Sequence, residues 1–219
     1  MPKHKPIKFE TTLEPDLKKY VIKIMKENPK AKTIFSATLG IVAMGGILTF
    51  GAAFPNLLGE IGKMRQRQKR ESYEQYRKIW NNFHSLKKCN ALKFIKEENG
   101  CLVYTITEKG REKIKKFAFD EIKISNPKEW DKKWRLVIFD IPEKYAKSRN
   151  ALRHKLEDLG FYQCQKSAWI YPFPCAGEIE FIKDVLNLKS FVKLFLVDEM
   201  TDGKVLYHFK NLLKNNIIK

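Results

Sequence analysis

The fold of this chain is decided by residues 134–172, which open with the run WRLVIFDIP (residues 134–142). This run is rich in β-branched and aromatic residues and closes with an acid and a proline, which is typical of a strand that ends near Asp140. A polar segment of helical character follows over residues 143–159, and Gly160 ends it. A second β-favouring run covers residues 161–171. The sequence therefore predicts a strand, a helix and a strand, with one carboxylate at the end of the first strand.

The alternation continues toward the C-terminus. We expect strands at residues 134–141, 161–165, 168–171 and 191–197, and helices at residues 144–159 and 177–186. This βαββαβ order predicts a ferredoxin-like sheet with both helices on one face. The tail at residues 204–219 mixes apolar and basic residues, and its pattern predicts no place in the fold.

Residues 60–126 have a different organisation. Residues 72–89 show helical periodicity, with Ser72 as a suitable N-cap and with an apolar stripe formed by Tyr76, Ile79, Trp80, Phe83 and Leu86. Two β-favouring runs then flank Asn99-Gly100, a pair that favours a type I′ hairpin turn because both central residues need a positive φ. Another helix begins at Thr107. A helix, a hairpin and a helix are the order of a winged helix-turn-helix domain, so the predicted fold class is α+β, with this domain before the ferredoxin-like unit.

The charge of the chain suggests a polyanionic partner. Lys and Arg number 43 against 25 Asp and Glu, and residues 60–126 hold 17 basic and 9 acidic residues. We expect the helix at 72–89 to enter the major groove of double-stranded DNA and the wing tip to lie along the backbone. The candidate DNA-binding residues are Arg77, Lys78, Asn81, Ser85, Lys88, Asn99 and Gly100. The alternatives are a protein-interaction module and a simply solvated helix face.

The N-terminal part divides into a polar basic segment at residues 1–32, with helical character over 14–26, and an apolar segment at residues 33–59. Residues 34–59 contain no charged residue. This charge-free segment is long enough for a membrane span, which needs ~20 residues. Two interpretations stay open: an anchor over residues 34–54, or a buried first helix of the DNA-binding domain that ends near Pro55. A span would place residues 60–219 on the cytoplasmic side of the membrane. The basic run at residues 63–70 suits lipid headgroups or DNA phosphates.

The stretches at residues 135–143, 149–161 and 165–172 (QKSAWIYP) resemble two related families. One comprises the PaaX-type transcriptional repressors, and the other is the small CRISPR adaptation nuclease (Cas-two) family. The resemblance covers about residues 128–200 and implies a ferredoxin-like domain. The winged helix upstream favours a PaaX-like regulator. The further C-terminal domain of full-length repressors is not expected, so their acyl-CoA response is not carried over.

Asp140 decides between a regulator and an enzyme. The resemblance to the nuclease family implies that Asp140 from two protomers holds a divalent metal such as Mg²⁺, which would serve phosphodiester hydrolysis. The structural alternative is that Asp140 caps the following helix or fixes its turn, and one carboxylate with only Glu143 nearby favours this role. On the regulator interpretation no cofactor is expected.

We therefore expect a cytoplasmic, homodimeric DNA-binding regulator with four segments: residues 1–32, 33–59, 60–126 and 127–219. Dimerisation through the ferredoxin-like unit would match a palindromic operator. A metal-dependent nuclease and an adaptor anchored to the inner face of the membrane are the alternatives.

Overall fold

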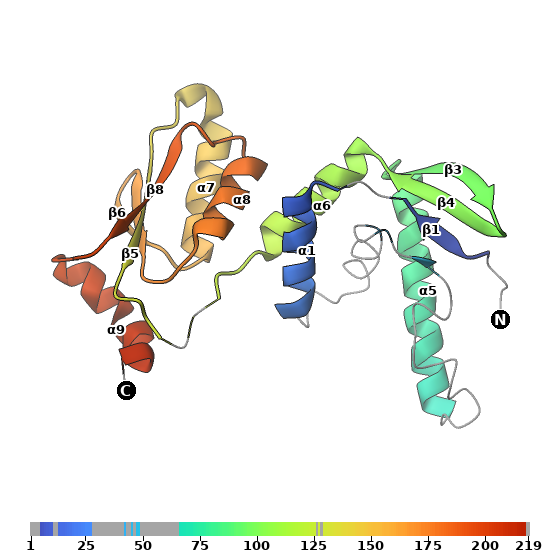
Figure 1. The fold of residues 1–219 in the computed structure, drawn as a ribbon, viewed down its shortest axis with the longest axis horizontal. Helices are drawn as coiled ribbons and strands as arrows, with labels where there is room; N and C mark the ends of the chain where they lie inside the picture. The colour runs from blue at the N-terminus through green and yellow to red at the C-terminus, as the bar shows by residue number, and fades with distance from the viewer. Residues whose placement is uncertain are drawn as a thin grey trace. The chain divides into compact units, whose positions relative to one another are not determined.

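The structure is a computed structural model that describes residues 5–10, 13–27, 42, 45, 47–48, 66–125, 127 and 129–217. The chain forms two compact units, residues 1–121 and residues 122–219. Each unit combines helices with a four-stranded sheet (Figure 1). The fold is therefore mixed α and β in both halves, as the sequence predicts.

The first unit is built on a sheet with the strand order β2-β1-β4-β3. Its strands are β1 (Ile7–Phe9), β2 (Ile47–Leu48), β3 (Leu92–Glu98) and β4 (Cys101–Ile106). Its longer helices are α1 (Pro15–Glu27), α5 (Gln66–Lys88) and α6 (Glu108–Glu121). β3 and β4 form the predicted hairpin, and Asn99 and Gly100 at its turn have φ values of 50° and 74°. These two positive φ values are what a type I′ turn requires.

Aromatic side chains join α5 to the sheet. The Phe83 ring packs edge-on against Tyr104 of β4, with 5.3 Å between ring centroids, and lies 6.2 Å from Phe9 of β1. Ile79, Trp80, Phe83 and Leu86 are all buried, which confirms these members of the predicted apolar stripe. The core thus includes Phe9, a residue far upstream of the hairpin.

Hydrogen-bonded caps end α5 and begin α6. Asn90 has φ 56°, its N–H donates to the Lys87 carbonyl, and the Ala91 N–H donates to the Leu86 carbonyl. This is a Schellman motif with Asn in the position that usually takes Gly. The Thr107 hydroxyl then accepts from the Gly110 N–H at 3.2 Å, as an N-cap does, and donates to the Asn90 carbonyl at 2.6 Å. The helix, the hairpin and the next helix are therefore fixed at one junction.

Two expectations for the first unit need correction. The helix begins at Gln66, so Ser72 lies inside α5 and is not its N-cap. Most of the apolar segment at residues 33–59 lies outside the described residues, but Ile47–Leu48 form β2 and pair with β1, so that segment is not one continuous helix. Among the described residues, no helix has the length and apolar character needed to cross a membrane.

The second unit has the predicted βαββαβ connectivity. Its elements are β5 (Trp134–Phe139), a 3-10 turn η1 (Glu143–Tyr145), α7 (Ala146–Asp158), β6 (Tyr162–Gln165), β7 (Ala168–Tyr171), α8 (Ala176–Val185) and β8 (Val192–Val197). The strand order is β6-β7-β5-β8, with every neighbouring pair antiparallel. This order is that of a split βαβ sheet. Gly160, with φ 85°, ends α7 as predicted.

A final helix, α9 (Gly203–Ile217), is the element for which the sequence predicted no place. Figure 1 shows α7 and α8 on one side of the sheet and α9 on the other. Val205, Phe209 and Leu213 of α9 are buried at helical spacing, and the Phe209 ring lies 5.7 Å from Trp134. The tail therefore covers part of the sheet face that α7 and α8 leave open.

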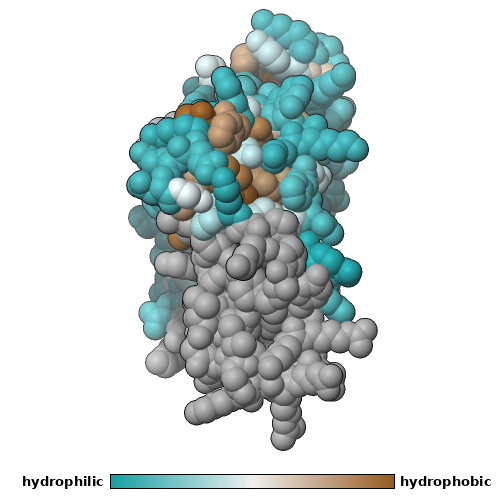
Figure 2. Space-filling model, turned by 90° about the vertical axis from the view of Figure 1, so that its right-hand side faces the viewer, coloured by the Kyte–Doolittle hydropathy of each residue, from teal (hydrophilic) through white to brown (hydrophobic). Residues whose placement is uncertain are grey.

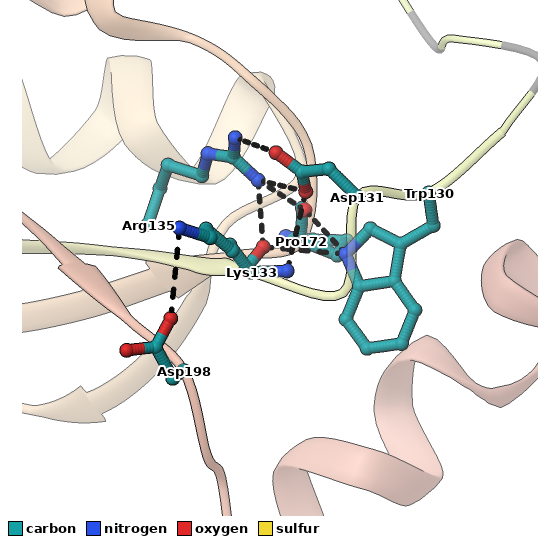
Figure 3. Close-up of polar contacts among 6 residues, drawn as sticks. All are labelled: Trp130, Asp131, Lys133, Arg135, Pro172 and Asp198. Atoms are coloured by element: carbon teal, nitrogen blue, oxygen red, sulfur yellow. Dashed lines mark hydrogen bonds and ion pairs between the residues drawn. The ribbon is translucent and has the colours of Figure 1, made fainter.

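A polar cluster fixes the start of β5 (Figure 3). The buried Arg135 guanidinium donates to both carboxylate oxygens of Asp131 and, through Nη1, to the carbonyls of Lys133 at 2.6 Å and Pro172 at 3.0 Å. The Trp130 indole N–H also donates to the Pro172 carbonyl, at 2.8 Å. These bonds tie the segment before β5 to the end of β7. The Asp131 carboxylate also neutralises the Arg135 charge, which would be costly to bury alone.

Candidate nucleic-acid interface

The outward face of α5 presents the predicted DNA-binding side chains. Arg77, Asn81, Ser85 and Lys88 follow one another at intervals of three or four residues and therefore share one helix face. These four residues and Lys78 are all exposed. The apolar stripe on the other side of α5 is buried against β1 and β4, so this orientation is set by the core of the unit.

The tip of the β3–β4 hairpin, which the sequence predicted as a wing tip, is exposed at both Asn99 and Gly100. Two glutamates precede the tip, and each is paired with a lysine: Lys5 Nζ lies 2.6 Å from Glu97, and Lys96 Nζ lies 3.2 Å from Glu98. The tip itself therefore lacks a surplus of positive charge among the described residues. A phosphate approaching it would meet backbone N–H groups and paired lysines rather than a basic cluster.

Lys87 is a surface residue that the sequence pattern did not single out. Its ammonium group lies 5.3 Å from the centroid of Tyr104 and 5.8 Å from that of Phe83, which are cation–π distances. Phe94 of β3 packs edge-on against Tyr104 and is 48% exposed. The signal available in the sequence was the spacing of four residues between Phe83 and Lys87. The pairing with Tyr104 required the hairpin to fold back.

Figure 2 shows the side of the molecule that carries β1, β3 and β4 on the right of Figure 1. Hydrophobic residues gather there among hydrophilic ones (Figure 2). Phe94 and Ile95 of β3 are exposed apolar side chains. Helix α5 and the hairpin diverge from their junction at residues 89–91 (Figure 1). The candidate residues of α5 and those of the hairpin tip therefore belong to one unit, but they lie on two elements that extend in different directions.

Asp140 is exposed directly after β5. Its backbone N–H donates to the Phe191 carbonyl at 3.1 Å, while the nearby Glu143 carboxylate pairs with Arg149 at 2.8 Å. The capping residues of η1 and α7 are Pro142 and Tyr145, and neither makes a side-chain cap hydrogen bond, so a capping role for Asp140 is not seen. Within the described part of the chain, no three His, Cys, Asp or Glu side chains gather as a metal site would require. The metal site proposed from the sequence would need a second protomer, so Asp140 as a catalytic residue stays a prediction.

Two further residues of the resembling stretch lie in β7 and in the turn before it. Trp169 is buried in β7, and the Ser167 carbonyl accepts from the Phe139 N–H at 3.0 Å. Both residues hold β7 against β5. They therefore help to shape the strand end that displays Asp140.

The comparison with protein families agrees with this geometry. Residues 127–205 match the family model described as the PaaX protein central Cas2-like domain. Residues 127–205 of the second unit are therefore similar to a Cas2-like domain, which is consistent with a PaaX-type family, as the resemblance implied. No curated protein matches the chain.

Proposed function

We propose that this protein is a PaaX-like transcriptional regulator that binds double-stranded DNA through a winged helix in the first unit. The observation that supports this most directly is the exposed polar face of α5, backed by a buried apolar stripe and followed by the β3–β4 hairpin. A helix about 10–12 Å wide fits the major groove. In this proposal Arg77 and Asn81 reach base edges, Lys78 and Lys88 contact phosphates, and the hairpin serves as the wing.

The second unit would hold two copies together through its ferredoxin-like sheet. Ile138 of β5 is 40% exposed and Phe195 of β8 is 46% exposed, and the register of the two strands puts both on one face of the sheet. β8 is also an edge strand, with one side open to pairing. A dimer would cover this apolar surface and present two winged helices to a two-fold symmetric DNA site.

DNA binding is tested by fluorescence anisotropy with labelled duplex DNA. The full chain is required, because β1 pairs with β4 and α1 packs on α6, and removal of the N-terminal residues would damage the first unit. Lys78→Ala is expected to weaken binding. It should also make the fall of log affinity with log salt concentration less steep, by about 1 in slope. Lys113→Ala, an exposed lysine of α6, is the matched control and is expected to change neither. Equal effects of both variants would contradict the assignment of α5.

Gel electrophoresis of the same labelled duplex after incubation separates the regulator from the nuclease. Duplex that stays intact with EDTA and with Mg²⁺ or Mn²⁺, and that Asp140→Ala binds normally, is the result expected for a regulator. Shortened duplex only in the presence of metal, abolished by Asp140→Ala, would show the nuclease instead.

Dimerisation is tested by light scattering after gel filtration. Phe195→Asp is expected to give a monomer, because a charge would be buried in the interface. Leu206→Asp changes a comparably exposed apolar residue on α9 and is expected to leave the dimer intact. A monomeric unmodified chain would contradict the proposal.

A further inference from the structure

A groove in the second unit lies outside the proposed DNA interface and at the β6 edge of the sheet, opposite the β8 edge proposed for dimerisation. It lies between β6 and α9 and has a volume of about 660 Å³. Its lining residues are Tyr162, Gly203, Lys204, Tyr207, His208, Lys210 and Asn211. Most of them lie beyond residue 205, where the match to the Cas2-like domain ends. The groove is therefore a feature of this chain's own C-terminal helix.

The packing of α9 builds the groove. The burial of Val205, Phe209 and Leu213 fixes which side of α9 faces the core. The groove-lining residues Lys204, Tyr207 and Asn211 also follow at helical spacing and lie on a different side of the helix. The rings of Tyr162 and His208 lie 5.0 Å apart and close the groove between strand and helix. Tyr207 is 78% exposed, the most exposed of the large apolar or aromatic side chains in the described part of the chain. A side chain this exposed contributes little to the folded core.

The lining combines flat rings with cations. Lys210 Nζ lies 5.9 Å from the centroid of the Tyr207 ring. No carboxylate lines the groove, and neither Lys204 nor Lys210 forms an ion pair with an acid in the described residues. The nearest acid in sequence, Asp202, accepts a hydrogen bond from the Lys204 N–H at 2.8 Å and so caps the start of α9. The groove therefore keeps a net positive charge beside exposed aromatic faces.

We propose that this groove binds a nucleoside phosphate. The base would stack on Tyr207 or Tyr162, the phosphate would contact Lys204 and Lys210, and the Asn211 amide would donate to or accept from the base edge. Two lysines suit a group that carries more than one negative charge. The volume is within the usual range of small-molecule sites, about 300–1,000 Å³. A free nucleotide and the phosphorylated end of a nucleic-acid strand both offer this combination of a base and a phosphate. The proposal does not depend on DNA binding by α5.

The test is isothermal titration calorimetry of the full chain with adenosine 5′-monophosphate, adenosine and inorganic phosphate. The monophosphate is expected to bind saturably, and adenosine and phosphate to bind about tenfold or more weakly, because each lacks one set of contacts. Lys210→Gln is expected to weaken binding of the monophosphate about tenfold while leaving adenosine unchanged. Tyr207→Ala is expected to weaken both, and its thermal unfolding should match that of the unmodified chain because Tyr207 is exposed.

A matched control lies elsewhere in the same unit. Lys144 Nζ lies 5.0 Å from the ring centroid of Tyr145, so Lys144→Gln removes a similar lysine–tyrosine pair outside the groove. It is expected to leave binding of the monophosphate unchanged. The proposal is overturned if the monophosphate shows no saturable heat at millimolar concentration, if inorganic phosphate binds as tightly, or if Lys144→Gln weakens binding as much as Lys210→Gln.

A further titration distinguishes the two sources of the ligand. Tighter binding of a 5′-phosphorylated oligothymidylate than of thymidine 5′-monophosphate, lost in Lys210→Gln, would identify the end of a strand. Equal or weaker binding of the oligonucleotide would identify a free nucleotide. Either result supports the groove as a nucleoside-phosphate site.

Discussion

Replacement of Asp131 by Asn tests whether the cluster around Arg135 holds the second unit together (Figure 3). The Arg135 side chain is only 7% exposed, and Asp131 is its carboxylate partner, with both oxygens engaged. Asn keeps one acceptor oxygen but removes the negative charge. The buried guanidinium then has only neutral acceptors, which are the new amide oxygen and the carbonyls of Lys133 and Pro172. The substitution should therefore destabilise the second unit.

The expected loss follows from the exposure of the pair. Hydrogen bonds to charged groups contribute roughly 1.5–3 kcal/mol. The Asp131 side chain is 43% exposed, so solvent screening reduces this figure, and we expect a loss of about 1–2 kcal/mol. Asp198→Asn is the control, because Asp198 pairs with Lys133 at 3.8 Å with both side chains at least half exposed. That change removes the same charge from the same unit and should cost under about 0.5 kcal/mol.

Urea unfolding followed by tryptophan fluorescence measures this difference. The rings of Trp130 and Trp134 lie 5.3 Å apart beside the cluster, so their emission reports on the second unit. The transition of each unit should be fitted separately, because two compact units need not unfold together. An unchanged midpoint for Asp131→Asn, or an equal shift for Asp198→Asn, would refute the reasoning.

Acidification gives a second check on the same pair. The hydrogen bond from Arg135 lowers the pKa of Asp131 from its ordinary value of 3.8. A lowered pKa in the folded state means that the stabilisation is present above pH 3.8 and is lost as the pH falls through the folded-state pKa. The difference in stability between the unmodified chain and Asp131→Asn should therefore be constant at neutral pH and shrink in acid.

Three further outcomes are expected. Gly110→Ala should destabilise the first unit by about 1–3 kcal/mol or more in urea unfolding, because an added Cβ would lie 2.3 Å from the Ala91 carbonyl oxygen. Gly100→Ala meets no atom within 4 Å and should cost only about 1 kcal/mol, the strain of a positive φ; a larger loss than for Gly110→Ala would contradict the junction described above. Burial raises the pKa of the Cys175 thiol to about 12, so a thiol reagent at pH near 8 should label exposed Cys89 rapidly and Cys175 only on unfolding, with peptide mapping as the measurement.

Local signals in the sequence predicted most of the second unit. The βαββαβ order, the end of α7 at Gly160 and the Asn99–Gly100 hairpin of the first unit follow from period-two alternation, helical spacing and the need for positive φ. The exposed residues of α5 were predictable for the same reason, since the apolar stripe fixes which face is buried. Whether those residues bind DNA stays a prediction.

Other features came only from the tertiary structure. β1 is three residues long and pairs in parallel with β4, which begins about ninety residues later, so no local pattern indicates the pairing. The place of α9 depends on which part of the sheet α7 and α8 leave open, and the groove beside Tyr162 exists only because α9 packs there. The hydrogen bond from Arg135 to the Pro172 carbonyl likewise joins segments far apart in sequence. The sequence by itself determined the elements and their buried faces, because these depend on neighbours along the chain. The tertiary structure decided the strand partners, the polar cluster and the groove, because these depend on surfaces that meet only after the chain has folded.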